Sequence, residues 1–151
     1  MIADRDFDLV IMTDFLMQND KAFKRPMSVS LALQNTTIEE YSKKLCQKGT
    51  VVYEKAENGD MKGMLVAYMH DLPVDRGSYI TFLLISGKYR NQGVAYRLVE
   101  EYKEICRDNN ISYIWANTLK ISKEPRRVFE KAGFEATSGA DEDHLRYEYR
   151  F

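Results

Sequence analysis

The clearest pattern along the chain is a change from strand-like to helix-like spacing of its hydrophobic residues. Residues 79–85 (YITFLLI) form one apolar, β-branched and aromatic run of strand length. The run breaks at 86–88, and beyond it hydrophobic residues recur at the spacing of one helix face, with charged residues between them. These are Val94, Leu98, Tyr102 and Ile105. The pattern predicts a buried strand, a tight turn and an amphipathic helix, in that order.

The N-terminal part of the chain predicts two helices. Hydrophobic residues at helical spacing indicate a helix over 6–19. Residues 37–40 (TIEE) have the form of a capping box, and Gly49 supplies a stop, so a second helix is predicted between them. Residues 28–33 are compatible with either a helix or an extended segment.

The remaining elements complete a mixed α/β sheet. In order, we predict strands at 50–56 and 61–70 joined by an Asn-Gly hairpin turn, a loop at 71–77, a strand at 111–117, a short helix from Ser122 to Gly133, and a terminal hairpin of 134–138 with 144–151. A first strand near residues 1–3 is left open. A strand–helix–strand unit of this length implies a right-handed parallel pairing.

Composition narrows the class of protein. The 151 residues suit a single domain spanning 1–151, and 22 basic against 23 acidic side chains call for neither a nucleic acid nor an anionic membrane as partner. No run resembles a membrane span or a signal peptide, so we expect a cytoplasmic protein. Cys46 and Cys106 show no metal-like spacing to His70 or His144, so we expect reduced cysteines and no metal site.

The turn after residue 85 has the chemistry of a phosphate site. Free backbone N–H groups converge at a helix N-terminus, where the helix dipole favours negative charge. The turn lacks both the P-loop and the dinucleotide-binding patterns. It reads instead Arg90-x-x-Gly93-x-Ala95, in which Gly93 and the small Ala95 allow close approach of a ligand to the backbone. The alternative is an ordinary strand-to-helix turn with a surface arginine.

This pattern resembles motif A of the GNAT superfamily of acyl-CoA-dependent N-acyltransferases, [RQ]-x-x-G-x-[GA]. Residues 128–134 (VFEKAGF) resemble that family's motif B, and the resemblance extends from about Thr37 to the C-terminus. It implies a mostly antiparallel sheet with helices on both faces, and one parallel pair, 79–85 with 112–118, that splays apart. It also implies acetyl-CoA as co-substrate and a set of CoA-binding positions. These are Leu83, Leu84, Ile85, Arg90, Asn91, Gln92, Gly93, Val94, Ala95, Ser122 and Phe129.

The departures from the family pattern concern catalysis. The motif B tyrosine, a proton donor in many relatives, falls at Phe129, which has no proton to give. The motif B asparagine falls at Ser122, which keeps a hydrogen-bonding and capping role. The glutamate that serves as base in some relatives falls at Tyr79, a poor base but a usable acid. The alternative for Tyr79 is packing on the sheet.

The sequence thus predicts an N-acetyltransferase that moves an acetyl group from acetyl-CoA to a small-molecule amine by direct transfer in a ternary complex. Amino sugars are among the candidate acceptors, and the protein is expected to be a monomer or a homodimer. Two alternatives stay open. One is a non-catalytic acyl-CoA-binding or regulatory domain, and the other is an interaction module whose turn binds nothing.

Overall fold

The computed structural model describes residue 2 and residues 9–20, 27–137 and 141–151. Its strands are β1 (Thr50–Lys55), β2 (Met61–Leu72), β3 (Asp75–Ile85), β4 (Tyr113–Leu119), β5 (Glu135–Ala136) and β6 (His144–Arg150). Its helices are α1 (Leu9–Gln18), α2 (Met27–Leu33), α3 (Ile38–Lys48), α4 (Val94–Asp108) and α5 (Lys123–Lys131), and the 3-10 helix η2 (Gly87–Tyr89) precedes α4. The strands form one sheet in the order β1-β2-β3-β4-β6-β5, and β3–β4 is the parallel pair.

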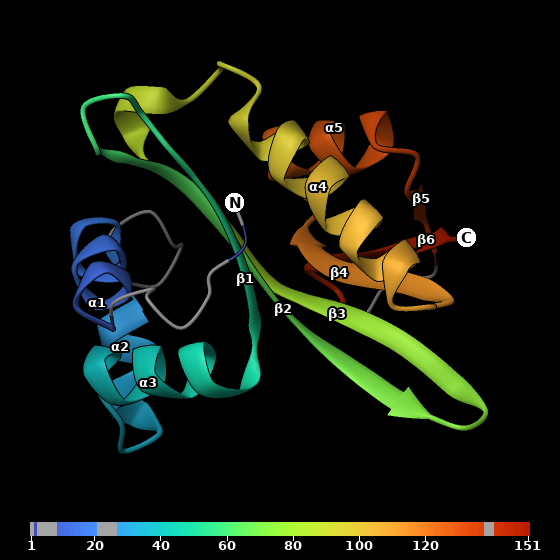
Figure 1. Ribbon diagram of the computed structural model, residues 1–151, viewed down its shortest axis with the longest axis horizontal. Helices are drawn as coiled ribbons and strands as arrows, with labels where there is room; N and C mark the ends of the chain where they lie inside the picture. The colour runs from blue at the N-terminus through green and yellow to red at the C-terminus, as the bar shows by residue number, and fades with distance from the viewer. Residues whose placement is uncertain (1, 3–8, 21–26, 138–140) are drawn as a thin grey trace.

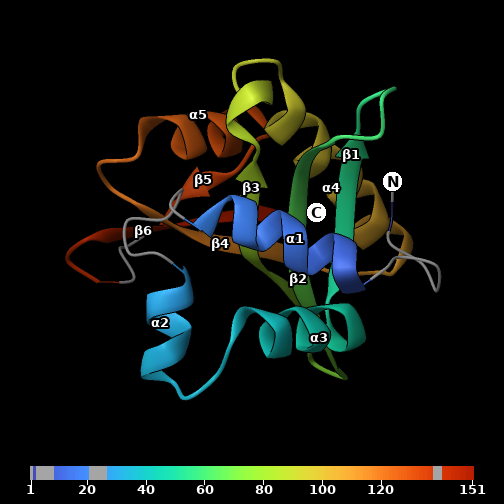
Figure 2. The same ribbon diagram turned by 90° about the vertical axis from the view of Figure 1, so that its left-hand side faces the viewer.

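Helices cover both faces of this sheet, as the mixed α/β prediction requires. In Figure 1 the strands run diagonally between α1–α3 on one side and α4 with α5 on the other. Figure 2, turned by 90°, shows α1 crossing in front of the strands. Each face has its own hydrophobic cluster. Val94, Leu98 and Phe129 belong to the cluster under α4 and α5, whereas Phe15 and Leu45 belong to the cluster under α1–α3.

One extra residue in β3 lets this strand contribute to both clusters. Val66 of β2 pairs with Phe82, but its neighbour Ala67 pairs with Ile80, so Thr81 is a β-bulge. Ile80 consequently packs under α4, and Phe82 packs under α1–α3. Without the bulge, two residues separated by one position would face the same side of the sheet.

Local signals at α3 act as the sequence predicts. The Thr37 hydroxyl accepts a hydrogen bond from the Glu40 N–H at 3.2 Å, and Gly49 donates its N–H to the Leu45 carbonyl at the other end. The carboxylate of Glu40 accepts from the Thr36 hydroxyl at 2.9 Å. The ambiguous segment 28–33 is helical, because Met27 and Leu31 bury one face of α2 in the α1–α3 cluster.

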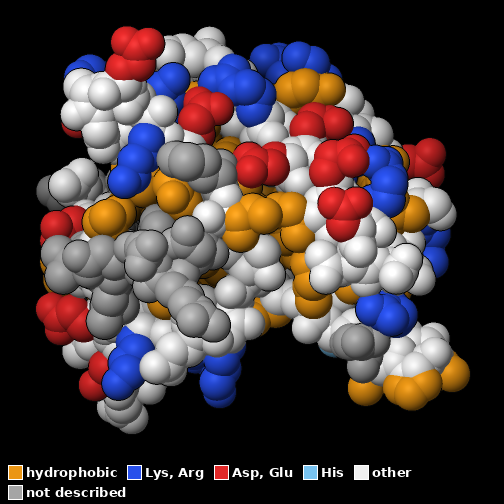
Figure 3. Space-filling model, viewed as in Figure 1, with side chains coloured by type: hydrophobic (Ala, Val, Ile, Leu, Met, Phe, Trp, Pro, Cys, Tyr) orange, Lys and Arg blue, Asp and Glu red, His pale blue; other side chains and the backbone are white. Residues whose placement is uncertain are grey.

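The prediction of a loop over 71–77 is wrong. Strands β2 and β3 continue pairing as far as Leu72 opposite Asp75, and only Pro73 and Val74 form the turn. Backbone pairing across the hairpin stabilises a polar segment that has no strand-like side-chain pattern of its own. The hairpin extends beyond the rest of the sheet, and hydrophobic side chains are exposed at its tip, at the lower right of Figure 3. Leu72 is 55% exposed and Val74 is 97% exposed.

The other elements agree with the predictions within a few residues. Strand β4 begins at Tyr113 rather than 111, and it pairs along its whole length with β6. The terminal hairpin is present as β5 and β6, while Ser138 lies outside the described residues. At the N-terminus, Ile2 forms an isolated antiparallel bridge with Val52.

Both cysteines are free, and Cys106 is fully buried. Its thiol lies near the hydroxyls of Ser78 and Tyr102, and burial raises its pKa to about 11. None of the helices in the described ranges is both long enough and apolar enough to cross a membrane. The cytoplasmic location stays a prediction.

Candidate functional site

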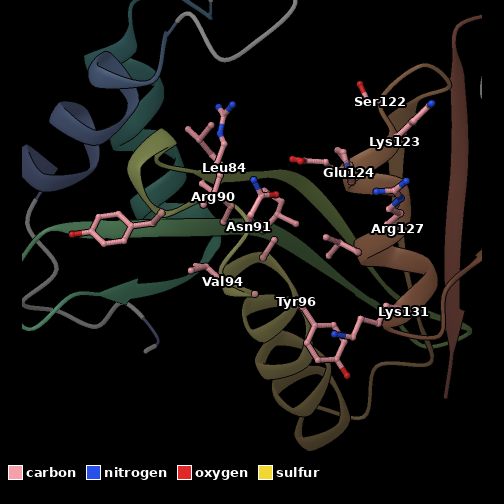
Figure 4. Close-up of a pocket in the computed structure, with 17 residues that line it drawn as sticks. Leu84, Arg90, Asn91, Val94, Tyr96, Ser122, Lys123, Glu124, Arg127 and Lys131 are labelled. Carbon is pink, nitrogen blue, oxygen red and sulfur yellow. The ribbon is translucent and has the colours of Figure 1, made fainter.

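The parallel strands β3 and β4 separate soon after they meet. They pair only from Gly77 opposite Tyr113 to Tyr79 opposite Trp115. Beyond that point a cavity of about 630 Å³ opens, lined by the end of β3, the turn 89–96, Ser122 and one side of α5. Figure 4 shows the turn and the start of α4 on one side of this cavity and α5 on the other. The predicted splay is therefore present, and it opens into a cavity that borders the predicted turn.

The turn that enters α4 presents free N–H groups to the cavity. The first intrahelical hydrogen bond at this end runs from the Arg97 N–H to the Gly93 carbonyl, at 3.1 Å. The N–H groups of Val94, Ala95 and Tyr96 therefore precede the hydrogen-bonded part of the helix. Gly93 has a φ of +76°, a left-handed conformation that other residues adopt only with strain. This geometry fits an anionic group held by the backbone, as in a phosphate site.

Arg97 fixes the position of this turn, and sequence reasoning missed it. Its guanidinium makes two hydrogen bonds of 2.8 Å to the carboxylate of Glu54 on β1. It also donates to the Gln92 carbonyl at 2.9 Å. The hydrogen bond to Arg97 lowers the pKa of the Glu54 carboxyl, although partial burial opposes that shift. Glu54 and Arg97 lie 43 residues apart, so no local pattern could have indicated the pair.

The charge around the cavity is mostly positive. The lining contains Arg90, Lys123, Arg127 and Lys131 against a single carboxylate, Glu124. Figure 4 shows Glu124 projecting from α5 toward the turn, and Lys131 lying against Tyr96 at the other end of the cavity. The Lys131 ammonium is 4.3 Å from the centroid of the Tyr96 ring. A lining of this kind suits a ligand with several negative charges.

Most of the residues predicted from the sequence line this cavity. They are Leu83, Leu84, Ile85, Arg90, Asn91, Gly93, Val94, Ala95 and Ser122. Gln92 is absent from the lining, because its side chain turns back and donates to the Lys88 carbonyl at 3.3 Å. Ser122 occupies the N-cap position of α5, but its side chain makes no capping hydrogen bond, so the capping role predicted for it is wrong.

Phe129 lies behind the cavity rather than in its wall. Its side chain is 3% exposed, and its ring packs against Phe134 and stacks on Tyr147, with centroids 5.1 and 6.0 Å away. The Tyr147 hydroxyl donates to the Glu130 carboxylate at 2.7 Å and accepts from the Arg126 Nε at 3.1 Å. Phe129 therefore holds α5 against the sheet, and it is not part of the cavity lining, so the CoA contact implied for it stays a prediction.

Tyr79 lies at the base of the splay, where the parallel pairing ends. Its ring stacks on Trp115 with centroids 4.2 Å apart, which agrees with the sheet-packing alternative. Burial raises the pKa of its phenol above the ordinary value. Burial, with Tyr68 and Tyr79 nearby, likewise raises the pKa of Tyr41 on α3 to about 12. These hydroxyls are protonated near neutral pH, so they are able to donate a proton but not to act as bases.

The two histidines are engaged away from the cavity. His70 contacts the Tyr113 hydroxyl at 3.2 Å, and His144 contacts the carboxylate of Asp141 at 2.9 Å. Within the part of the chain that the structure describes, no group of three or more His, Cys, Asp or Glu side chains is arranged to hold a metal ion.

Comparisons with known proteins agree with this geometry. A family model described as acetyltransferase (GNAT) domain matches residues 30–145. No curated protein matches the chain at the sequence level. The similar solved structures include a GNAT-family acetyltransferase from Streptococcus pneumoniae, with a TM-score of 0.77 and 15% identity over 100% of this chain and 99% of that one.

Two further structures share the fold at similarly low identity. The ribosomal-protein-S5-alanine acetyltransferase from Vibrio fischeri has a TM-score of 0.76 and 16% identity, over 99% of this chain and 91% of that one. A Bacillus subtilis acetyltransferase solved in complex with CoA has a TM-score of 0.63 and 15% identity, over 74% of this chain and 83% of that one.

Proposed function

The chain belongs to the GNAT acetyltransferase family, and on that premise we propose that it transfers the acetyl group of acetyl-CoA to the amine of a small molecule. The observation that carries the proposal is the turn at residues 90–95, whose free N–H groups face the cavity at the N-terminus of α4. The diphosphate of CoA would bind these groups. The positive lining would bind the remaining phosphate, and the exposed edge of β3 at Leu83–Ile85 would pair with the amide-bearing pantetheine arm.

The reaction needs little from the protein beyond positioning. The thioester supplies an already activated acyl carbon. In a direct transfer, the neutral amine nitrogen attacks that carbon, a C–N bond forms, the C–S bond breaks, and the amine gives up one proton as the thiol regains one. Holding the amine in line with the acyl carbon in a ternary complex supplies most of the rate. Tyr79 is the side chain at the base of the splay that is able to donate a proton to the sulfur, directly or through water.

A non-catalytic acyl-CoA-binding domain is the second candidate. Two observations favour it. Phe129 replaces the tyrosine of motif B and is buried in the core, and no carboxylate lies on the cavity half of β3. Because a thioester is already activated, neither observation excludes catalysis.

Two measurements test the proposal. Calorimetric titration with acetyl-CoA should show saturable binding. A thiol-release assay with acetyl-CoA and a panel of small amines, amino sugars included, should show amine-dependent thiol production. Binding without amine-dependent release would select the non-catalytic alternative, and absence of binding by a folded protein would overturn both.

A further inference from the structure

The face of the sheet that carries α1–α3 has a row of side chains at the base of the splay. Tyr68, Tyr79, Trp115 and Glu148 are direct partners across β2, β3, β4 and β6. Side chains of directly paired residues project from the same face, so the row is continuous. Tyr68 packs against the α1–α3 cluster, which identifies the face, and Figure 2 is a view onto that side.

The cavity reaches this face through the splay. Leu83 and Leu84 both line it, although successive residues of a strand point to opposite faces. Leu83 packs against the cluster under α4, whereas Leu84 belongs to the cluster under α1–α3. The cavity therefore passes around the edge of β3 that β4 leaves unpaired. The stacked rings of Tyr79 and Trp115 lie on the α1–α3 face, where the parallel pairing ends and the splay begins.

Arg146 places a positive charge over one of these rings, that of Trp115. Its guanidinium carbon is 4.2 Å from the centroid of Trp115, so the planar group lies over the ring. One nitrogen, Nη2, is 3.5 Å from the Glu148 carboxylate. Within the described chain, the remaining N–H groups of Arg146 make no hydrogen bond, and its side chain is 34% exposed. A stacked guanidinium with free N–H groups is prepared for two-point binding of a carboxylate.

The one carboxylate of the row already forms ion pairs with two arginines. Glu148 is approached by Arg146 at one oxygen and by Arg150 at the other, and its side chain is only 12% exposed. The row therefore offers no unpaired carboxylate to an acceptor with a second positive charge. An acceptor with a negative charge, in contrast, could accept hydrogen bonds from the guanidinium N–H groups of Arg146 that no described residue engages. Arg146, beside the row, thus has hydrogen-bond donors that no residue in the described part of the chain uses.

We propose that the acceptor is a primary amine that also carries a carboxylate a few bonds away, as an α-amino acid does. Arg146 binds that carboxylate over the face of Trp115, and the amine then lies beside Tyr79 at the opening of the splay. This inference rests on the proposed function, and it narrows the acceptor from amines in general to carboxylate-bearing amines.

The test uses acceptors of nearly the same shape that differ in the charge near the amine. Rates are compared at equal concentrations of the neutral amine, because loss of the carboxylate charge lowers the pKa of the amine. Thiol release from acetyl-CoA is measured with an α-amino acid series and the matching α-amino amides, which have nearly the same shape but no negative charge. Wild type should prefer the acids by about ten- to a hundredfold in kcat/KM, the range expected for a charge-assisted hydrogen-bonded pair. Arg146→Gln should abolish this preference by raising KM for the acids, while the affinity for acetyl-CoA stays at the wild-type value. Arg146→Lys should retain part of it.

Arg150→Gln is the matched control, because Arg150 also pairs with Glu148 but lies over Tyr113, at 5.2 Å, rather than Trp115. This variant should keep the preference for acids. Equal turnover of acids and amides by wild type, or an Arg146→Gln variant that still prefers acids, would overturn the inference and leave the proposed function intact. Melting of the CoA-loaded protein gives a second readout, in which the acids should stabilise wild type and not Arg146→Gln. Stabilisation by neither series, or equally by both, would also overturn the inference, whereas failure to bind acetyl-CoA at all would instead overturn the proposed function.

Discussion

Replacing Gly93 tests whether the turn before α4 binds a diphosphate through its backbone. We expect Gly93→Asp to eliminate measurable acetyl-CoA binding while the protein remains folded. The left-handed φ of +76° makes any side chain cost about 1–2 kcal/mol of folding free energy, equivalent to roughly 2–8 °C in Tm for a chain of this size. An acidic residue at the start of a helix recovers about 0.3–1 kcal/mol of that loss.

The effect on binding should be much larger than the effect on stability. At a separation of about 5 Å and an effective dielectric constant of about 20, the new carboxylate and one phosphate charge repel by roughly 3 kcal/mol, or more than about a hundredfold in Kd. A side chain also occupies the space above the turn, where the ideal Cβ position is 3.1 Å from the Nη1 of Arg97.

Gly93→Asn is the matched control, because asparagine has the shape of aspartate without its charge and tolerates left-handed backbone. Titration with acetyl-CoA should rank wild type tightest and Gly93→Asp undetectable, with Gly93→Asn and Arg90→Ala between them. Arg90→Ala should have a mild effect, because Arg90 is an exposed side chain at the rim and is screened by solvent. Unchanged affinity in a folded Gly93→Asp protein would refute the phosphate-binding role of the turn and most of the functional reasoning with it.

Three further predictions concern proton transfer, packing and pH. Tyr79→Phe should lower acyl transfer by about one to two orders of magnitude without changing acetyl-CoA affinity, if the hydroxyl donates a proton; a rate within about twofold of wild type would assign Tyr79 to packing alone. Phe129→Ala should cost about 3–5 kcal/mol, or roughly 6–20 °C in Tm, because the side chain is buried; Phe129→Leu is the milder control, and an unchanged melt for Phe129→Ala would contradict the buried position. The lowered pKa of Glu54 stabilises the fold at pH values above its unfolded pKa near 4.5, and this contribution is lost as pH falls through the lower folded pKa. Chemical denaturation at pH values between about 3 and 7 should therefore show that the free energy of unfolding falls more steeply on acidification for wild type than for Arg97→Gln. Parallel pH dependences of the two proteins would exclude this linkage.

The parts of the fold that sequence predicted correctly are those specified by neighbouring residues. Thr37 and Glu40 are close enough in the chain to form their cap before any tertiary contact exists. The turn before α4 is also specified locally, because Gly93 allows its left-handed backbone conformation and the hydrophobic spacing of α4 starts directly after it. These local signals were sufficient to predict the turn, the start of α4 and most of the residues that line the cavity beside them.

Features that depend on distant partners could not be predicted in this way. The polar segment 71–77 forms strand only because the two halves of a hairpin pair with each other. The motif match placed Phe129 on the correct helix, but the face that α5 presents to Phe134 and Tyr147 is decided by packing. Arg146 lies over Trp115 but belongs to β6, whereas Trp115 belongs to β4, so no pattern of neighbouring residues in the sequence could predict their contact.

The bulge at Thr81 also affects how this chain can be compared with its relatives and how it can tolerate change. A substitution at Thr81 leaves the alternation of side chains intact on both sides of it. Removal of one residue there would turn Phe82 and Leu84 away from the α1–α3 cluster and expose the opposite set of side chains to it. Position 81 is therefore expected to tolerate a substitution but not a deletion. At the 15–16% identity of the similar structures, an alignment that slips by one residue in this strand would match side chains of the α4–α5 face with side chains of the α1–α3 face.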